Sequence, residues 1–356
     1  MSFVRLDPQD FVVSADSISA TLWSGGVPTL TTFYTSSTQE AGSSGNYYLN
    51  IFQTASTSAD AAIQFAIAYG NKAGSGSSFY NAGVIGKSPT GTTYGQYQNL
   101  IIGDENTDFS FGTNTVTEFW ALSIDRTRYK EKLFLGSMAL ILSGSSGSIT
   151  LTDNSVVATS VVFNEAGRVF QIVSGSQGII YTGSNSNGYS VDQGSYGWFL
   201  PDIATILLNP AALGTIAASG GIGLVTSQSY NSDGLNNRKM FNAINQTGAR
   251  SFMLNSEETI ASDYVFIRAR NAEFNYSENP SFISGSTGEV LYSGFINNPQ
   301  TYITTVGLYN DTNELLAVAK LSRPLLKDFT KEALVRLKLD FILIFGLFST
   351  AMSLLF

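Results

Sequence analysis

The sequence predicts an all-β, mainly antiparallel protein with a β-sandwich-like body, long loops and few short helices. Three observations carry this prediction. Short segments rich in β-branched and aromatic residues recur along the chain, and most alternate with a period of two. Turn residues separate them, with 34 Gly and many Gly-Ser and Asn-Gly pairs. Few stretches show helical periodicity. Short strands between frequent turns are typical of sandwiches and barrels.

The expected strands follow from this pattern in chain order. In Ile63–Tyr69 the larger side chains of Ile63, Phe65, Ile67 and Tyr69 fall on one face. The expected strands are Tyr47–Phe52, Ile63–Tyr69, Phe119–Ile124, Leu133–Leu142, Ser148–Thr152, Val169–Val173, Tyr264–Arg270, Thr301–Tyr309, Leu315–Leu321 and Ala333–Asp340.

The segment GLYNDTNELLAVAKL, residues 307–321, predicts a hairpin. Leu308 leads into a turn at Asn310–Asn313, and Leu316, Val318 and Lys320 alternate on the return. The Asn and Asp residues of this turn tolerate left-handed backbone conformations.

Two stretches are candidates for helices. The better one is Pro201–Leu213, where Asp202 lies near a helix start and Pro210 would interrupt a long helix. The second is Leu325–Leu337, but the alternation of ALVRLKLDF favours a strand over its last part.

Composition divides the chain of 356 residues into three parts. Residues 1–46 are expected to form an N-terminal arm or small subdomain, because this region is rich in Ser, Thr and Gly. Residues 47–340 are expected to form the β-rich body, as one sandwich or two. Residues 341–356 (FILIFGLFSTAMSLLF) form an uncharged apolar tail that is short for a membrane span. We expect it to be buried between subunits or docked onto a partner, with a membrane anchor as the less favoured alternative.

The chain contains no His and no Cys, which excludes whole classes of chemistry. Ser-His-Asp and Cys-His arrangements, imidazole or thiolate zinc sites, and disulfides cannot form within it. We expect no enzymatic activity, no metal and no cofactor.

Charged residues make up only 13% of the chain, and the net charge is −8. A surface with so few charges is poorly protected against self-association, which predicts packing against partner subunits. The negative charge disfavours nucleic-acid binding. The densest basic group is Arg126, Arg128, Lys130 and Lys132, expected on the solvated face of a strand.

Two motifs are interpreted as structural, and two further pairs of residues are considered for catalysis. The segment Ala217–Val225 lacks the spacing of a dinucleotide loop and predicts a turn. Gly103–Gly112 lacks the Gly and Glu of a calcium loop and predicts Asx hydrogen bonds. The pairs Glu257–Glu258 and Asp153–Asn154 could in principle serve glycoside hydrolysis, which needs two carboxylates across a cleft.

Aromatic residues are the expected interface anchors. The candidates are Trp23, Trp198 and Phe199, and Trp120 is expected more in the core than at an interface. Trp198 follows the Gly-rich loop Gly183–Gly197, which makes it the strongest interface candidate.

Long stretches of the chain resemble virion structural proteins of contractile-tailed bacteriophages, particularly the T4-like marine cyanophages. The resemblance spans most of residues 47–341, and the final apolar segment departs from it. It lies in AAIQFAIAYGNKAGSGS (Ala61–Ser77), YGQYQNLIIGDENTDFSFG (Tyr94–Gly112), DRTRYKEKL (Asp125–Leu133), RVFQIVSGSQGIIYTG (Arg168–Gly183), YGWFLPDIATILLNP (Tyr196–Pro210), SDYVFIRARNAEFNYSENPSF (Ser262–Phe282) and YITTVGLYNDTNELLAVAKLSRPLLKDFTKEALVRLKLDF (Tyr302–Phe341).

The resemblance implies a non-enzymatic tail or baseplate subunit, present in several copies, whose partners are other virion proteins. Such a chain would be made in the host cytoplasm and end in the virion tail. The alternative function is a receptor-binding or fibre-associated module that recognises host glycans through Gly183–Gly197. A polysaccharide-degrading tailspike is less favoured, because no long β-helical repeat is found.

Overall fold

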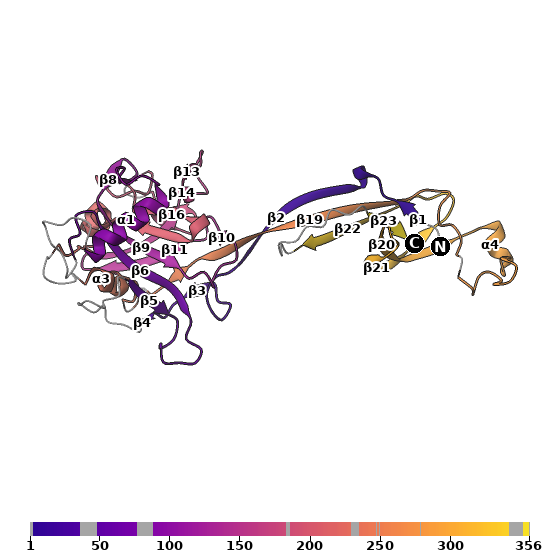
Figure 1. Cartoon of the computed structure of the whole chain (residues 1–356), viewed down its shortest axis with the longest axis horizontal. Coiled ribbons are helices and arrows are strands. Elements are labelled where there is room, and N and C mark those ends of the chain that lie inside the picture. Colours follow the sequence, from indigo (N-terminus) through magenta and orange to yellow (C-terminus); the bar gives the residue numbers. More distant parts are fainter. Residues whose placement is uncertain are drawn as a thin grey trace. The chain divides into compact units, whose positions relative to one another are not determined.

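A computed structural model describes residues 3–35, 48–76, 88–182, 186–228, 235–246, 248, 250–277, 279–341 and 352–355 (Figure 1). The chain forms two compact units. The central unit is Ile18–Glu258, and the terminal unit combines Met1–Ser17 with Thr259–Phe356. Two strands, β2 (Phe11–Thr21) and β19 (Asn255–Ala269), run through the boundary. These units differ from the three parts expected from composition, because contacts join the two ends of the chain.

The central unit is built on one large antiparallel sheet. Its strands in spatial order are β3 (Thr29–Leu30), β18 (Phe252–Met253), β11 (Ala139–Gly144), β12 (Gly147–Asp153), β14 (Gly167–Ser176), β16 (Gly197–Leu200), β17 (Thr205–Leu208), β9 (Glu118–Ile124), β6 (Ile63–Asn71), β5 (Tyr48–Phe52) and β4 (Tyr34–Thr35). The short strands β13 (Val162–Asn164) and β15 (Ile179–Ile180) also pair with β14. A separate hairpin joins β7 (Phe109–Phe111) to β8 (Asn114–Val116), and β10 (Lys132–Leu133) pairs with β19.

This sheet curls, so that strands far apart in its order share one core. The Phe252 ring of β18 lies 5.5 Å from the Phe65 ring of β6, although six strands separate the two segments in the sheet. Trp23 fills the space between them, with its ring 4.9 Å from Phe252 and 6.2 Å from Phe65. The curl therefore encloses an aromatic core.

Helices cover both faces of the sheet. α3 (Asn236–Ile244) contributes Met240 to the main core inside the curl. α1 (Pro89–Ile101) packs on β6 from the other face, where Tyr94 stacks 5.5 Å from Phe119. It begins at Ser88, whose side chain accepts a hydrogen bond from the Gly91 N–H. The remaining short helical turns are 8–10, 201–203, 210–214 (α2), 217–219 and 293–297 (α4).

The terminal unit is a two-layer arrangement of strands. One sheet has the order β1 (Phe3–Arg5), β23 (Met352–Leu355), β20 (Thr301–Asn310), β21 (Leu315–Lys327). In the other, β22 (Ala333–Phe341) pairs with β19 over nine residue pairs from Ala261↔Phe341 to Ala269↔Ala333. A small core lies between them: Leu6, Val265, Ile267, Ala269, Ile303, Val306, Leu308, Ala333 and Val335.

The all-β prediction is confirmed, and most expected strands are present within one to three residues at their ends. The alternation of Ile63–Tyr69 is confirmed, since Phe65, Ile67 and Tyr69 lie together in the main core. The hairpin at Asn310–Asn313 is also confirmed, with Asn313 in a left-handed conformation at φ 64°.

Three expectations are wrong. Pro201–Leu213, expected as a helix, instead contains a 3-10 turn, the central strand β17 and the short helix α2. Thr205–Leu208 is a strand because β16 pairs with one of its edges and β9 pairs with the other. The strand expected over Leu133–Leu142 is divided by a turn, since its first and last parts pair with different strands. The basic segment 126–131 is a turn rather than a strand, because Asp125 accepts backbone and hydroxyl hydrogen bonds from Thr127.

Candidate interaction surface

The expected aromatic anchors lie mostly inside the central unit. Trp23 is 2% exposed and belongs to the core of the curl, and Phe199 is fully buried in the same core. Trp198 is half-buried on the opposite face of β16, where its ring lies 5.7 Å from Phe109 and 5.6 Å from Phe111. Trp120 is buried, and its Nε1 donates to the Asn236 carbonyl at 3.0 Å. Trp23 and Phe199 therefore present no exposed side chain to a partner, which corrects the expectation for these two residues.

The loop expected to bind glycans is held against the body of the central unit over its described part, residues 186–197. Ser190 and Gly194 form a β-bridge, and Ser195 Oγ donates to Gln171 Oε1 at 2.6 Å. Asn209 Nδ2 donates to the carbonyls of Gln193 and Ser195 at 3.0 and 2.9 Å. Residues 183–185 lie outside the described residues.

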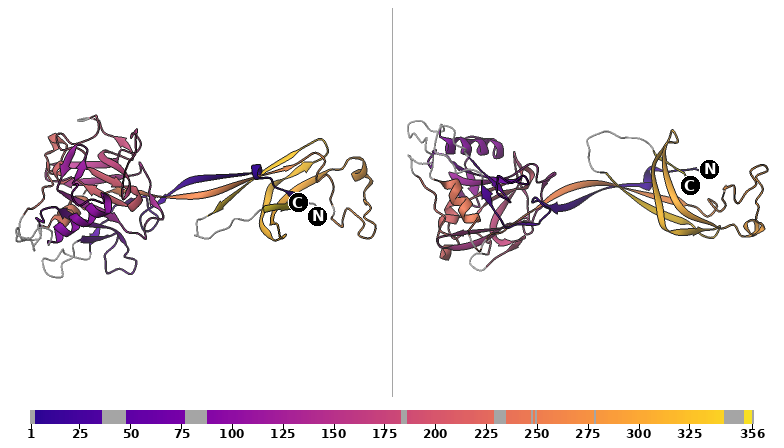
Figure 2. Two further views of the ribbon diagram at one scale, coloured as in Figure 1. Left: turned by 45° about the horizontal axis from the view of Figure 1, so that its top comes forward. Right: turned by 90° about the horizontal axis from the view of Figure 1, so that it is seen from below.

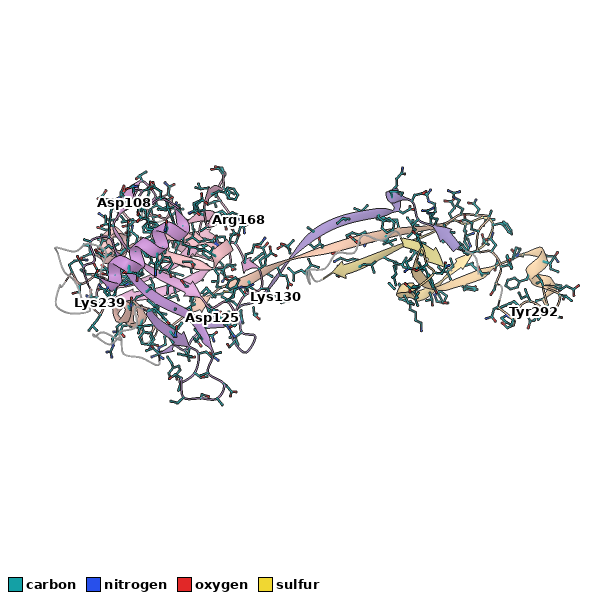
Figure 3. All side chains as sticks on the ribbon, viewed as in Figure 1. Asp108, Asp125, Lys130, Arg168, Lys239 and Tyr292 are labelled. Carbon is teal, nitrogen blue, oxygen red and sulfur yellow. The ribbon has the colours of Figure 1, made fainter. Side chains whose placement is uncertain are left out.

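The cations of the basic segment have local partners. Lys130 Nζ lies 2.6 Å from Glu258, and Lys132 Nζ lies 3.7 Å from Glu257. Arg128 donates to Ser24 Oγ, and Arg126 donates to the Tyr129 carbonyl at 2.6 Å. Lys130 is labelled in Figure 3. These contacts hold the turn at 126–131 in place. They also engage Glu257 and Glu258, the two acids considered for glycoside hydrolysis.

Asp153 is buried and structurally engaged. Its carboxylate accepts two hydrogen bonds of 3.1 Å from the Gly136 N–H and others from Ser155. Burial raises the pKa of Asp153, while these donors oppose the shift. The acid thus fixes the turn between β10 and β11 to the end of β12. Within the described residues, no group of three or more acidic side chains is arranged to hold a metal ion.

A polar cluster surrounds Glu118 at the start of β9, and the sequence did not predict it. Tyr69 donates to this carboxylate, and Gln228 Nε2 does so at 2.9 Å. Thr226 Oγ1 is a third donor at 3.2 Å. Burial and the Glu118 charge both raise the pKa of Tyr69. Because a phenol with a raised pKa stays protonated and donating, the cluster holds segment 226–228 to the sheet.

The terminal unit, by contrast, exposes apolar side chains on the outer face of the β20–β21 hairpin. β20 and β21 lie side by side in the terminal unit (Figure 2). Tyr309 pairs with Leu315 and Gly307 pairs with Val318, so these residues share a face. A Cβ at Gly307 would lie 2.8 Å from the Tyr309 ring and 3.3 Å from Leu315, which shows that both side chains close over the glycine. Leu315, Leu316 and Val318 are 52%, 48% and 59% exposed. We call Tyr309, Leu315, Leu316 and Val318 the hairpin patch.

The turn beside the hairpin patch is fixed by Asn310. Its Oδ1 accepts hydrogen bonds from the N–H groups of Thr312 at 3.1 Å and Glu314 at 2.7 Å. Its Nδ2 donates to Glu314 Oε2 at 2.8 Å. Because these hydrogen bonds fix the conformation of the Asx turn, they also hold the adjoining hairpin patch in a defined orientation.

β21 is the last strand of its sheet in the described part of the chain. Its ladder with β20 breaks between Lys320 and Leu325, so that residues 321–324 bulge out opposite Thr304. A second irregularity lies at Leu316. Bulges, Lys320 and Pro324 are features that limit pairing along an exposed edge. The regular stretch of this edge is therefore short and runs from Ala317 to Lys320.

A second exposed apolar group lies on segment 271–300, which connects β19 to β20. Phe282 packs against Phe295 at 5.2 Å and Tyr292 at 6.1 Å, but Tyr292 itself is more than half exposed (Figure 3). Among the described residues 279–300 none is buried. Tyr276, Leu291 and Ile296 are exposed as well. A connection of this length without a core of its own is usually either functional or a linker.

Lys327, fully buried at the end of β21, anchors the base of that segment. Its Nζ donates to the Asn271 carbonyl at 3.0 Å, to Asn275 Oδ1 at 2.8 Å and to the Asp328 carbonyl at 2.9 Å. Burial lowers the pKa of Lys327, and nearby acids including Asp328 oppose the shift. Three acceptors satisfy the three ammonium protons.

We expect the substitution Lys327→Met to destabilise the terminal unit by about 1–3 kcal/mol, because three buried acceptors lose their donor. Thermal unfolding measures this loss, and amide exchange at 271–277 should rise in parallel. The matched control is Arg323→Met on the same strand, which is exposed and should change stability by less than about 0.5 kcal/mol. Equal effects of both substitutions would contradict the anchoring role.

Comparison with known proteins adds no relative. No protein-family model matches the chain, and no curated protein or solved structure shows significant similarity to it. Within the described residues, the helices are too short or too polar to cross a bilayer. Any function must therefore be argued from the residues themselves.

Proposed function

We propose that this chain is a non-enzymatic structural subunit of a bacteriophage virion, most specifically a component of a contractile-tail baseplate. It acts by binding neighbouring subunits through its terminal unit. Its place in the virion tail and its partners, other tail proteins and further copies of itself, belong to the same proposal.

The observation that carries the proposal is the outward apolar face of the β20–β21 hairpin. The inner face of this sheet already packs on the core through Ile303, Val306 and Leu308. A sheet with apolar residues on both faces requires a covering layer, and monomeric proteins rarely leave such a patch in water. The low charge content of the chain, 13%, agrees with assembly.

The resemblance to phage tail proteins supports assembly into a virion as the proposed function. Tyr302–Phe341, one of the segments that carry it, includes the whole hairpin patch and strand β22. The local chemistry is also that of a scaffold, because Asp153, Glu118, Glu257 and Glu258 are each held by structural partners.

The decisive experiment is to look for the chain in purified particles. Mass spectrometry of intact virions and of isolated tails should find it in stoichiometric amounts. Particles made without it should have incomplete baseplates by electron microscopy. Complete particles that only fail to adsorb would favour the receptor-binding alternative. Chain cleavage of host polysaccharide by the purified protein would overturn the non-enzymatic assignment.

The hairpin patch gives a sharper prediction. The double substitution Leu315→Ser and Val318→Ser should lower incorporation into particles about tenfold or more, because each buried apolar side chain contributes about 1–2 kcal/mol to an interface. The thermal unfolding of the isolated chain should change little, since both residues are exposed. Particle composition measured by quantitative mass spectrometry checks the result.

The matched control carries Val162→Ser and Phe163→Ser, two exposed apolar residues of β13 in the central unit. Normal incorporation of this control together with loss for the patch variant would locate the interface. If both variants enter particles normally, the hairpin patch is not the contact.

A further inference from the structure

We infer that residues 279–300, which precede β20, form a second contact of the terminal unit and bind a different virion protein, one whose surface is apolar at its centre and basic at its rim. We call residues 279–300 the connecting segment. The inference rests on the proposed function and deepens it, because a subunit with both the hairpin patch and this segment joins two neighbours. It is argued from the order, exposure and charge of the segment.

The connecting segment has a fixed local structure, although none of its residues is buried. Ile283 and Val290 form an antiparallel bridge, and the Ser284 N–H donates to the Glu289 carbonyl at 2.8 Å. The Leu291 N–H donates to the Phe282 carbonyl at 2.9 Å, which closes the same small hairpin. A segment that is ordered before it binds loses less conformational entropy on binding.

The base of the connecting segment is anchored. Lys327 holds the chain at Asn271 and Asn275, ahead of the segment. Thr301 Oγ1, directly after the segment, donates to the Phe274 carbonyl at 2.5 Å. Binding residues are commonly carried by loops that a rigid scaffold positions. The strands β19, β20 and β21 supply that scaffold here.

Apolar side chains gather around Phe282 and remain open to solvent. The Phe282 ring lies 5.2 Å from the Phe295 ring and 6.1 Å from the Tyr292 ring. Leu291, Tyr292 and Ile296 are all more than half exposed. The core of a protein interface is aromatic and aliphatic with few charges, and one partner contributes about 20–30 residues to an interface of standard size. The connecting segment meets both requirements.

The rest of the connecting segment is polar but carries no cation. Half of its residues are Ser, Gly, Asn or Tyr, which are the residues enriched in antibody recognition loops. The whole connection 271–300 contains three Glu and no Lys or Arg. A partner with a basic rim is therefore electrostatically complementary to it, whereas nucleic acids and anionic glycans are not.

The same observations favour a protein other than a second copy of this chain. The chain is acidic overall, with a net charge of −8, so a second copy is a poor electrostatic match for an acidic segment. A neutral glycan would pack on the ring of Tyr292 but would gain little from the aliphatic side chains of Leu291 and Ile296. A protein surface with an apolar centre contacts all three.

Site-specific photo-cross-linking in purified particles tests this contact on the full chain. The photoreactive residue p-benzoylphenylalanine at position 291 should link the chain to one other virion protein. Tandem mass spectrometry should place the link in a peptide that contains Lys or Arg. The same probe at position 163, an exposed apolar site of the central unit, is the control and should give little of this product.

Charge variants test the basic rim. Glu289 is exposed, and Glu289→Lys should lower the yield of the cross-link from position 291 about fivefold or more, because it places like charges together. Glu105→Lys makes the same charge change at an exposed position of the central unit and should leave the yield unchanged. Both variants should keep the natural Tm, since neither side chain is buried.

A yield at position 291 no greater than that at position 163 would overturn the inference. A link to a glycan, to a second copy of the chain or to a peptide without Lys or Arg would also overturn it, as would a Glu289→Lys variant that cross-links normally. In each of these cases the proposed function stands, provided that the chain is present in the particles in stoichiometric amounts. Absence of the chain from purified particles would instead overturn the proposed function itself.

Discussion

The substitution Gly197→Ala should unfold the central unit at a markedly lower temperature than the natural sequence. Gly197 begins β16 with φ +143°, and a Cβ there would lie 1.8 Å from the Leu207 carbonyl oxygen and 2.8 Å from its carbon. Both contacts are with backbone of the neighbouring strand β17, which cannot move aside without breaking the ladder. We expect a loss of about 4 kcal/mol or more.

Thermal unfolding followed by circular dichroism would measure this effect as a decrease in Tm of roughly 8–16 °C for a unit of this size. The control is Gly95→Ala in α1, where a Cβ would meet no atom within 4 Å. Because alanine is the better helix former by about 0.5–1 kcal/mol, this substitution should slightly raise Tm. A Gly197→Ala variant as stable as the natural sequence would show that β16 and β17 are not packed as described.

The second large effect is expected for Phe252→Ala. Phe252 is fully buried, and its ring contacts both Trp23 and Phe65, at 4.9 and 5.5 Å. Its loss leaves a cavity at the place where the curled sheet meets itself. Such substitutions cost about 3–5 kcal/mol, through lost burial and the cavity that remains.

The measurement is chemical denaturation of the full chain, monitored by tryptophan fluorescence, since Trp23 lies in the affected cluster. Phe163→Ala is the matched control, because Phe163 is largely exposed on β13. It should change stability by less than about 0.5 kcal/mol. If Phe252→Ala were equally mild, the contact between β18 and β6 would not be part of the core.

Much of the strand structure could be predicted from residue patterns. Val265, Ile267 and Ala269 alternate with larger or charged residues, and the structure buries these three on one face. The same holds for β22, where Leu334, Arg336 and Lys338 point outward. Period-two patterning works here because each strand has one face on a core and one outside.

The pattern failed where both faces of a segment are buried. All four residues of Thr205–Leu208 are buried, so no alternation distinguishes this central strand from a helix. α1 was missed for the opposite reason. Its sequence PTGTTYGQYQNLI has two glycines and little amphipathicity, and only the pair Ser88–Pro89 marks its start.

The candidate surface could be predicted only in part. Residue patterns predict the hairpin over 307–321 and its alternation, but residue type favours Trp23, Trp198 and Phe199 as anchors over Leu315 and Val318. Aromatic type alone does not tell a core residue from an interface residue, because Trp and Phe fill cores as readily as they anchor interfaces. The contribution of Lys327 had no signal in the sequence, since two of its three acceptors lie more than fifty residues away.

The sequence by itself determined the all-β class, the position of most strands and the exclusion of histidine and cysteine chemistry, because these depend on composition and on neighbours one or two residues apart. Only the tertiary structure decided which segments form each unit, that Trp23 and Phe199 are inside, and that Leu315, Leu316 and Val318 are outside. Those outcomes depend on pairings between distant segments, such as β18 with β11 or β19 with β22. Such pairings are stabilised by packing between residues that are far apart in the sequence, so the pattern of neighbouring residues does not predict them.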